Sequence, residues 1–363
     1  MTATVLHLTG PVLVGLDDVR DSAWVVGGRV TFEPATSPGA DVVVLEGWVV
    51  PGIVDAHCHV GLGPHGAVDK ATAEQQAIDD RSAGTLLIRD AGSPADTRWI
   101  DERPDLPKVI RAGRHIARTR RYLRNYAHEV EPDALVERVR IEAKVGDGWV
   151  KLVGDWIDRD LGDLAPCWPR EVLAEAIAAA HEEGARVTAH CFGQESLYDF
   201  AAAGSDCVEH ATGLEPATIE QFAAQGIAIV PTLVNIATFP QIAEPAREKF
   251  PAYYQRMLDL HARRYETIGA AHEAGIPIYV GTDAGGSLRH GLAAQEAVEL
   301  DRAGLGPRGA LDSAAFAARR WLGRPGLEEG ADADLLVLDA DPREDITALT
   351  RPRHIVLRGV TVD

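Results

Sequence analysis

Short apolar segments alternate with amphipathic segments over most of this chain, and the alternation predicts its fold. Between residues 51 and 325, apolar runs are separated by stretches with helical periodicity, the pattern of an α/β protein with a parallel sheet. The strand candidates are the segment around His57 and residues 85–88, 108–110, 149–153, 185–189, 207–208, 227–230 and 276–280. The clearest helices are expected at 132–145, 170–183, 195–203, 216–225 and 252–274. This number of strands, with helices between them, predicts a (β/α)8 TIM barrel over residues 51–325.

The two ends of the chain have a different pattern. Residues 1–50 contain short strand-like runs separated by Gly and Pro, and residues 326–363 return to such runs after Gly330. The expected strands are 4–8, 23–26, 29–32, 41–45, 335–338 and 354–357. We therefore predict a small β domain, formed by residues 1–50 and 326–363, that clasps the barrel.

Charge and cysteine content narrow the possible partners. The 363 residues include 36 Lys and Arg against 55 Asp and Glu, a net charge of −19. So acidic a protein repels phosphate backbones and anionic lipid, which disfavours nucleic-acid and membrane partners and favours a small-molecule substrate. The chain has no apparent leader or membrane span, and its four cysteines form no Cys-x-x-Cys. We expect a cytoplasmic protein; whether it forms a homo-oligomer stays open.

The pair His57 and His59 is the first sign of chemistry. Residues two apart in a strand point to the same face, so both imidazoles would converge on one spot. Neutral imidazoles at one spot suit a divalent ion such as zinc. Alone, the spacing His-x-His is weak evidence.

Four further polar residues lie at or near the ends of other predicted strands, namely Lys151, His190, His210 and Asp283. In α/β barrels the functional groups collect at the C-terminal ends of the strands. Each residue alone has an ordinary explanation: a core histidine, a helix N-cap or a surface lysine. Six polar side chains converging on one rim are hard to explain as core filling, so the set predicts a metal centre.

This ordered set resembles the amidohydrolase superfamily, and its binuclear branch most of all. The similarity includes Gly-Trp-Val-Val-Pro-Gly-Ile-Val-Asp-Ala-His-Cys-His at 47–59 and Gly-Ala-Asp-Ala-Asp-Leu-Leu-Val-Leu-Asp at 330–339. Further segments resemble the prolidase and imidazolonepropionase-related group: Arg-Asp-Ala-Gly at 89–92, Val-Glu-His-Ala-Thr-Gly at 208–213, Val-Pro-Thr-Leu at 230–233 and Gly-Thr-Asp-Ala-Gly at 281–285. In that family the terminal strands form a β-sandwich, so the resemblance implies one here.

The resemblance also implies roles for the six residues. His57, His59 and Asp283 would bind one divalent ion, His190 and His210 a second, and zinc is the expected metal. A carbamylated Lys151 would bridge the ions, because a carbamate is an anionic oxygen ligand whereas an ammonium cannot bind a cation. A hydroxide shared by the ions would be the nucleophile, and Asp283 would act as the catalytic proton shuttle.

Candidate substrate-binding residues lie in loops that follow the strands. His65 and His290 come directly after ligand strands, and Tyr122 lies in an arginine-rich loop after the third strand. The arginines of that loop are Arg111, Arg114, Arg118, Arg120, Arg121 and Arg124, interleaved with Tyr122 and Tyr126. They are equally consistent with carboxylate binding and with a solvated loop or subunit contact. Strand alternation predicts that Cys58, Cys191 and Glu209 face away from the rim.

Two segments depart from prolidase-like relatives. Thr119–Tyr122 stands where a Gly-Gly-His element tends to hold the substrate carboxylate, and the loop Pro231–Ile236 lacks a tyrosine that relatives often place there. Both departures disfavour dipeptide hydrolysis.

The most favoured function is therefore hydrolysis of an amide-type C–N bond in a small molecule: a cyclic amide, an N-acyl amino acid, a dipeptide or a carbamate. The alternative is a heterocycle deaminase of the same superfamily. Such deaminases usually place Glu three residues after the fifth-strand histidine, where this chain has Gly193. A non-enzymatic relative is disfavoured further, because such proteins lose metal ligands.

Overall fold

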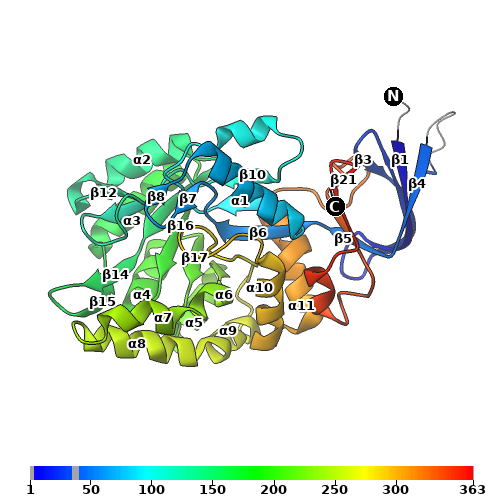
Figure 1. Ribbon diagram of the computed structural model, residues 1–363. Coiled ribbons are helices and arrows are strands. Elements are labelled where there is room, and N and C mark those ends of the chain that lie inside the picture. Colours follow the sequence, from blue (N-terminus) through cyan, green and yellow to red (C-terminus); the bar gives the residue numbers. More distant parts are fainter. Residues whose placement is uncertain (1–3, 35–40, 363) are drawn as a thin grey trace.

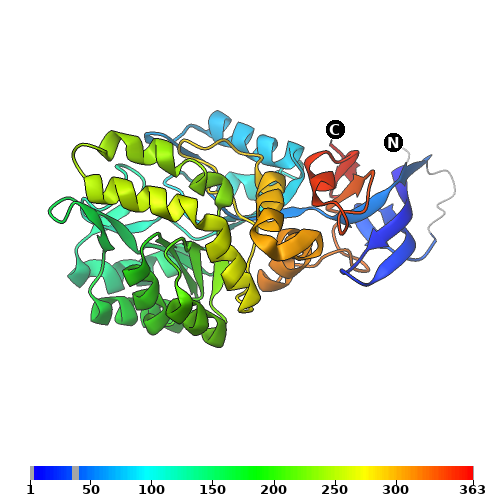
Figure 2. The same cartoon turned by 90° about the horizontal axis from the view of Figure 1, so that it is seen from below.

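The computed structural model describes residues 4–34 and 41–362. It contains a large α/β part and, at one end, a sheet built from strands of both chain termini (Figure 1). The view from below shows the same separation (Figure 2). Residues 1–3, 35–40 and 363 of the predicted terminal domain lie outside the described residues.

Two parallel sheets form the centre of the α/β part. The first has the order β10-β9-β6, with β6 Ile53–Cys58, β9 Thr85–Asp90 and β10 Lys108–Arg111. The second has the order β12-β11-β13-β16-β17-β18, with β11 Ile116–Arg118, β12 His128–Val130, β13 Trp149–Val153, β16 Arg186–Cys191, β17 Cys207–His210 and β18 Ala228–Val230. Every residue of β6, β9 and β13 is buried, which explains why these strands are mainly apolar in the sequence.

The last predicted strand, residues 276–280, is not a regular strand in the structure. It makes isolated parallel bridges instead, Ile278 with Ile229 of β18 and, further on, Ala284 with Cys58 of β6. Its backbone also bonds to both sides, from Tyr279 N to Ile229 O at 3.1 Å and from Ala56 N to Val280 O at 2.8 Å. This segment therefore lies between the two sheets.

Helices pack around these strands (Figure 1). They are α1 Lys70–Ser82, α2 Leu135–Val145, α3 Arg170–Glu182, α4 Gln194–Ala203, α5 Pro216–Gln225, α6 Leu233–Ile236, α7 Phe239–Ala243, α8 Pro251–Ala262, α9 Arg264–Glu273, α10 Ala293–Leu300, α11 Gly306–Leu311 and α12 Ala317–Trp321. The first four predicted helices are confirmed as α2 to α5. The single helix predicted at 252–274 is instead two, α8 and α9, that meet at Arg263. In these described residues, no helix is both long enough and apolar enough to cross a membrane.

Both termini contribute to one further sheet. Its order is β21-β20-β19-β5-β1-β2-β3, with β4 paired to β1. The strands are β1 Thr4–Leu13, β2 Val19–Val26, β3 Arg29–Thr31, β4 Asp41–Glu46, β5 Trp48–Pro51, β19 Leu335–Leu338, β20 His354–Leu357 and β21 Val360–Thr361. Antiparallel pairing of β5 with β19 joins the two ends of the chain. A shared terminal β unit is therefore present, whereas a sandwich of two separate sheets is not shown.

Two small hairpins complete the described strands. β14 Asp155–Asp158 pairs with β15 Asp163–Pro166, and β7 Leu62–Gly63 pairs with β8 Gly66–Ala67. Both follow strands that carry predicted ligands, so they bring additional side chains to the same end of the sheets.

Candidate metal centre

Three of the predicted ligands converge at the end of β6. The Nε2 atoms of His57 and His59 lie 2.8 Å and 3.0 Å from Oδ1 of Asp283, and the candidate ligand atoms all lie within 4.8 Å of one another. The two histidines are buried, while the side chain of Asp283 keeps 23% of its exposure. Two imidazoles and a carboxylate form a donor set that zinc accepts.

The backbone around Asp283 is tightly constrained. Asp283 has a φ of 61°, an unfavourable value for a residue with a side chain, and its N–H donates to the carbonyl of His57 at 2.7 Å. A Cβ at Gly281 would lie 2.8 Å from the Cβ of His57. Buried Asp55 accepts hydrogen bonds from His57 N at 3.0 Å and from Thr282 Oγ1 at 2.6 Å. The hydrogen bonds of Asp55 join β6 to the segment that precedes Asp283, and burial raises the pKa of this carboxyl to about 7.

The other two histidines form an adjoining pair. Nδ1 of His190 lies 3.0 Å from Nε2 of His210, and Nδ1 of His210 lies 2.7 Å from Oγ1 of Thr232. Burial lowers the pKa of His190 well below its usual value and that of His210 to about 3, so both imidazoles are neutral at pH 7. Their rings adjoin the first group, with the centroids of His57 and His210 5.4 Å apart.

Lys151 is buried and ion-paired. Its Nζ lies 2.5 Å from Oε2 of Glu209, and the other carboxylate oxygen of Glu209 lies 3.1 Å from Nη2 of Arg89. Burial alone would raise the pKa of Glu209, but the charges of Lys151 and of its other neighbours lower it well below the usual range. The positive charge of Lys151 also contributes to the low pKa of His190.

The prediction that Glu209 faces outward is therefore wrong. Its side chain is fully buried and contacts Lys151, Arg89 and Thr188. Alternation fails at this strand end because His210 has a left-handed backbone, with φ of 66°, so successive side chains no longer point to opposite faces.

A cavity of about 350 Å³ opens beside these residues. Its lining includes three predicted ligands, His59, His190 and Asp283, together with the predicted substrate residue Tyr122. The other lining residues are Leu62, Leu123, Tyr126, Trp156, Phe192, Asn235, Ile242, Tyr253, Gly285, Gly286, Ser287 and Leu288. The lining is thus mainly apolar and aromatic.

The structure gives no support for substrate contacts by His65 and His290. His65 is exposed and does not line this cavity. His290 is buried with Nδ1 2.8 Å from Oδ2 of Asp80, and these two residues and Cys58 form a second group of possible ligands. Burial would lower the pKa of His290, but Asp80 raises it, so the pair is explained as a buried ionic contact.

Two site residues were missed in the sequence. His115 is fully buried and its ring stacks on that of His59, with 4.8 Å between centroids. Neither ring nitrogen of His115 has a hydrogen-bond partner among the described residues, and burial holds its pKa well below the usual value. Asn235 donates from Nδ2 to Oδ2 of Asp283 at 2.7 Å. The signal for His115 was its position in Ala-Gly-Arg-His, directly after the third predicted strand.

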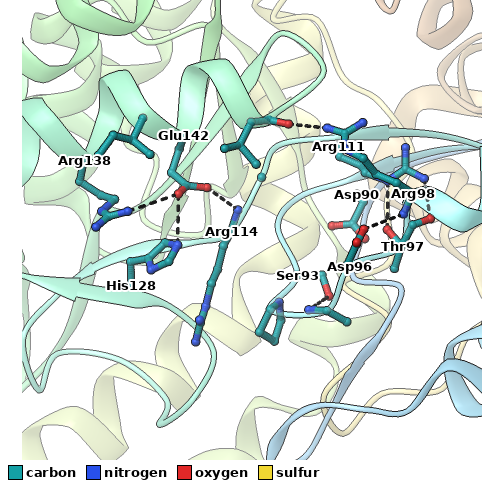
Figure 3. Close-up of a pocket in the computed structure, with 15 residues that line it drawn as sticks. Asp90, Ser93, Asp96, Thr97, Arg98, Arg111, Arg114, His128, Arg138 and Glu142 are labelled. Carbon is teal, nitrogen blue, oxygen red and sulfur yellow. Dashed lines mark hydrogen bonds and ion pairs between the residues drawn. The ribbon is translucent and has the colours of Figure 1, made fainter.

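Three arginines of the basic loop, Arg111, Arg114 and Arg121, make contacts within the fold and do not line the cavity beside the predicted ligands. Arg121 pairs with Asp158 at 2.8 Å and donates to two backbone carbonyls. Arg111 and Arg114 line a different cavity of about 570 Å³ between α2 and the segment after β9 (Figure 3). There Glu142 accepts from the backbone N–H of Arg114 at 2.9 Å and lies 3.1 Å from His128, so much of that cavity's charge is paired.

Comparisons with known proteins agree with this geometry. Residues 48–362 match a sequence model described as "Amidohydrolase family". An uncharacterized protein of Mycobacterium tuberculosis, Rv2915c, is 50% identical over 361 residues, which cover 99% of this chain and 96% of that protein. Ochratoxinase of Aspergillus niger is 27% identical over 225 residues, 60% of this chain and 46% of that protein.

Solved structures share the fold. A Xaa-Pro dipeptidase with methionine bound in its active site superposes with a TM-score of 0.82 and 21% identity, and the match covers 100% of both chains. The crystal structure of A. niger ochratoxinase gives a TM-score of 0.78 and 18% identity, covering 99% of this chain and 96% of that one. At these identities the similarity establishes the fold alone.

Proposed function

The chain belongs to the amidohydrolase family, and from this premise we propose that it is a metal-dependent hydrolase that cleaves an amide-type C–N bond of a small molecule. The observation that carries the proposal is that Nε2 of His57 and Nε2 of His59 both lie within 3.0 Å of Oδ1 of Asp283. The hydrolase names of proteins with the same fold, a dipeptidase, an ochratoxinase and a molinate hydrolase, support it. No observation at the site favours the deaminase alternative.

The residues present fit two divalent ions. His57, His59 and Asp283 would hold one, and His190 and His210 the other, with a carbamylated Lys151 between them. Nε2 of His190 is buried and has no hydrogen-bond partner among the described residues, as expected of a nitrogen that ligates an ion. Zinc is the proposed metal because the donor set is rich in imidazole. When bound, such ions activate water and polarise a carbonyl.

The chain's own residues then position and move protons. Asp283 lines the cavity, where its carboxylate accepts a proton from the attacking water and donates it to the leaving nitrogen. Asn235 fixes Oδ2 of that carboxylate. Thr232 bonds Nδ1 of His210, so that Nε2, which faces Nδ1 of His190, would be the ligand atom. Tyr122 borders the cavity where the substrate would lie.

The same proposal includes the barrel architecture, the class of substrate and the cellular location of the protein. The segment 276–284 bonds to both parallel sheets, which supports a (β/α)8 barrel over residues 51–325 with a terminal β-sandwich of 1–50 and 326–363. The net charge of −19 supports a small-molecule substrate over nucleic acid or a membrane. Four buried, unpaired cysteines support a cytoplasmic setting.

Amine release from an amide panel tests the function. Protein stripped by a chelator and reloaded with zinc and bicarbonate should hydrolyse at least one N-acyl compound, and the stripped protein should not. Equal activity of stripped and reloaded protein would contradict metal dependence. Ammonia release from heterocycles without amide hydrolysis would favour the deaminase.

A further inference from the structure

Aromatic side chains form a continuous wall in the cavity beside the predicted ligands. The ring of His190 lies 4.3 Å from that of Phe192 and 5.5 Å from that of Trp156, measured between centroids. Tyr122 continues the wall, 4.8 Å from Trp156, and Tyr126 lies 6.2 Å beyond it. These rings come from three segments of the chain, so the fold assembles an apolar surface that begins at a predicted ligand.

No lysine or arginine stands among the described residues that line this cavity. Two arginines of the basic loop are held by the fold: Arg121 by Asp158 and two carbonyls, and Arg114 by the carbonyl of Tyr126 at 2.9 Å. The described cavity lining therefore offers no cationic side chain to a free carboxylate.

The volume limits the size of the ligand. At about 350 Å³, the cavity lies near the lower end of the range for small-molecule sites and equals about a dozen water volumes. Gly286 has a positive φ, and a Cβ there would lie 2.9 Å from the hydroxyl of Tyr126, so a side chain at this position would be strained and would displace Tyr126. There is room for one aromatic ring and the amide next to it.

We infer that the substrate is a neutral aromatic amide, whose ring packs against Tyr122, Trp156 and Phe192 and which carries no free carboxylate beside the scissile bond. The inference rests on the proposed function and narrows it. Water adds to the carbonyl carbon and the C–N bond breaks, which gives a carboxylic acid and an amine; the proton of the acid passes to the amine, so the products are one carboxylate and one ammonium ion and all atoms and charges are accounted for.

Three probes separate the contributions of ring and charge. N-acetylphenethylamine has the ring without a carboxylate, N-acetyl-L-phenylalanine adds the carboxylate, and N-acetylisopentylamine lacks the ring. Their dissociation constants are measured by calorimetry on the full wild-type chain loaded with zinc, at low temperature and with amine release checked to be negligible during the titration.

The ring should tighten binding about tenfold over the isopentyl compound, and the carboxylate should add nothing. Three results would overturn the inference: tenfold tighter binding of the carboxylate probe, less than twofold gain from the ring, or no measurable binding of the phenethyl probe.

A matched pair of variants locates the ring. Trp156→Leu, made in the same background, should reduce the phenethyl-to-isopentyl ratio about fivefold. Trp99→Leu, at a tryptophan outside the cavity, should leave the ratio unchanged. Because each ratio is measured within one protein, a general loss of folded protein does not affect it. An unchanged ratio in Trp156→Leu would show that the ring does not bind at this wall.

Hydrolysis is measured separately, as amine release by the zinc-loaded wild-type protein. Aromatic preference in binding without any amine release would contradict the proposed hydrolase and leave the aromatic site standing. Amine release with a preference for the carboxylate probe would support the proposed hydrolase and contradict the inference of a substrate without a carboxylate.

Discussion

Replacing Asp283 by Asn changes the proposed proton shuttle while keeping its shape. Oδ1 of Asp283 faces His57 and His59 at 2.8 Å and 3.0 Å, and Oδ2 accepts from Asn235 at 2.7 Å. An asparagine that keeps its oxygen toward Asn235 must turn its NH₂ toward the two histidines. The variant therefore loses both the proton acceptor and one candidate metal ligand atom, at almost no change in volume.

The expected loss in turnover is at least about 100-fold, the lower range for general acid–base catalysis, or about 2.7 kcal/mol of transition-state stabilisation. The Michaelis constant should change much less, because the aromatic lining is untouched. The assay is amine release under zinc saturation, with metal content measured in the same samples. Asn235→Ala, which removes the hydrogen bond that orients Asp283, should cost about tenfold. Near-normal turnover of a fully metallated Asp283→Asn protein would refute the role of Asp283.

Three other predictions concern the bridge, a buried acid and the backbone. Lys151→Ala should abolish most activity but leave the fold intact by circular dichroism, with partial rescue by short-chain carboxylic acids; full activity would end the carbamate proposal. Burial raises the pKa of Glu296 to about 8 from 4.5, so its stabilisation is present below about pH 4.5 and is lost as pH rises through 8. Glu296→Gln should therefore gain urea stability relative to wild type between pH 5 and pH 8, unlike the exposed control Glu220→Gln; parallel curves would contradict this. Gly281→Ala should cost about 1–3 kcal/mol by overpacking, whereas Gly326→Ala, with its nearest neighbour atom at 3.9 Å, should be tolerated in urea titrations; equal losses would refute the steric argument.

Strand-end positions could be predicted from sequence because period and polarity are local properties. His57 and His59 follow from alternation within β6, and buried strands appear as apolar runs. The helix boundaries of α2 to α5 likewise follow from periodicity and from glycine or proline at their ends. The convergence of Asp283 on the histidine pair could be anticipated once a barrel was assumed.

The errors arise where tertiary contacts override local pattern. Glu209 points inward because His210 has a positive φ, which no residue type in that strand signals. His115 is placed by stacking on His59, a contact between segments far apart in sequence. The segment 276–280 makes only isolated bridges, although its composition is typical of a strand. The arginines of the basic loop were read by charge, but pairing with acids such as Asp158 depends on the fold.

Metal stoichiometry tests the central claim most directly. Protein purified without chelator, then incubated with zinc and bicarbonate and freed of unbound ions, is measured by elemental analysis against protein concentration. The proposed centre predicts two ions per chain. A reproducible ratio near one would remove Lys151 from its bridging role, and a ratio near zero would contradict a metal-dependent hydrolase.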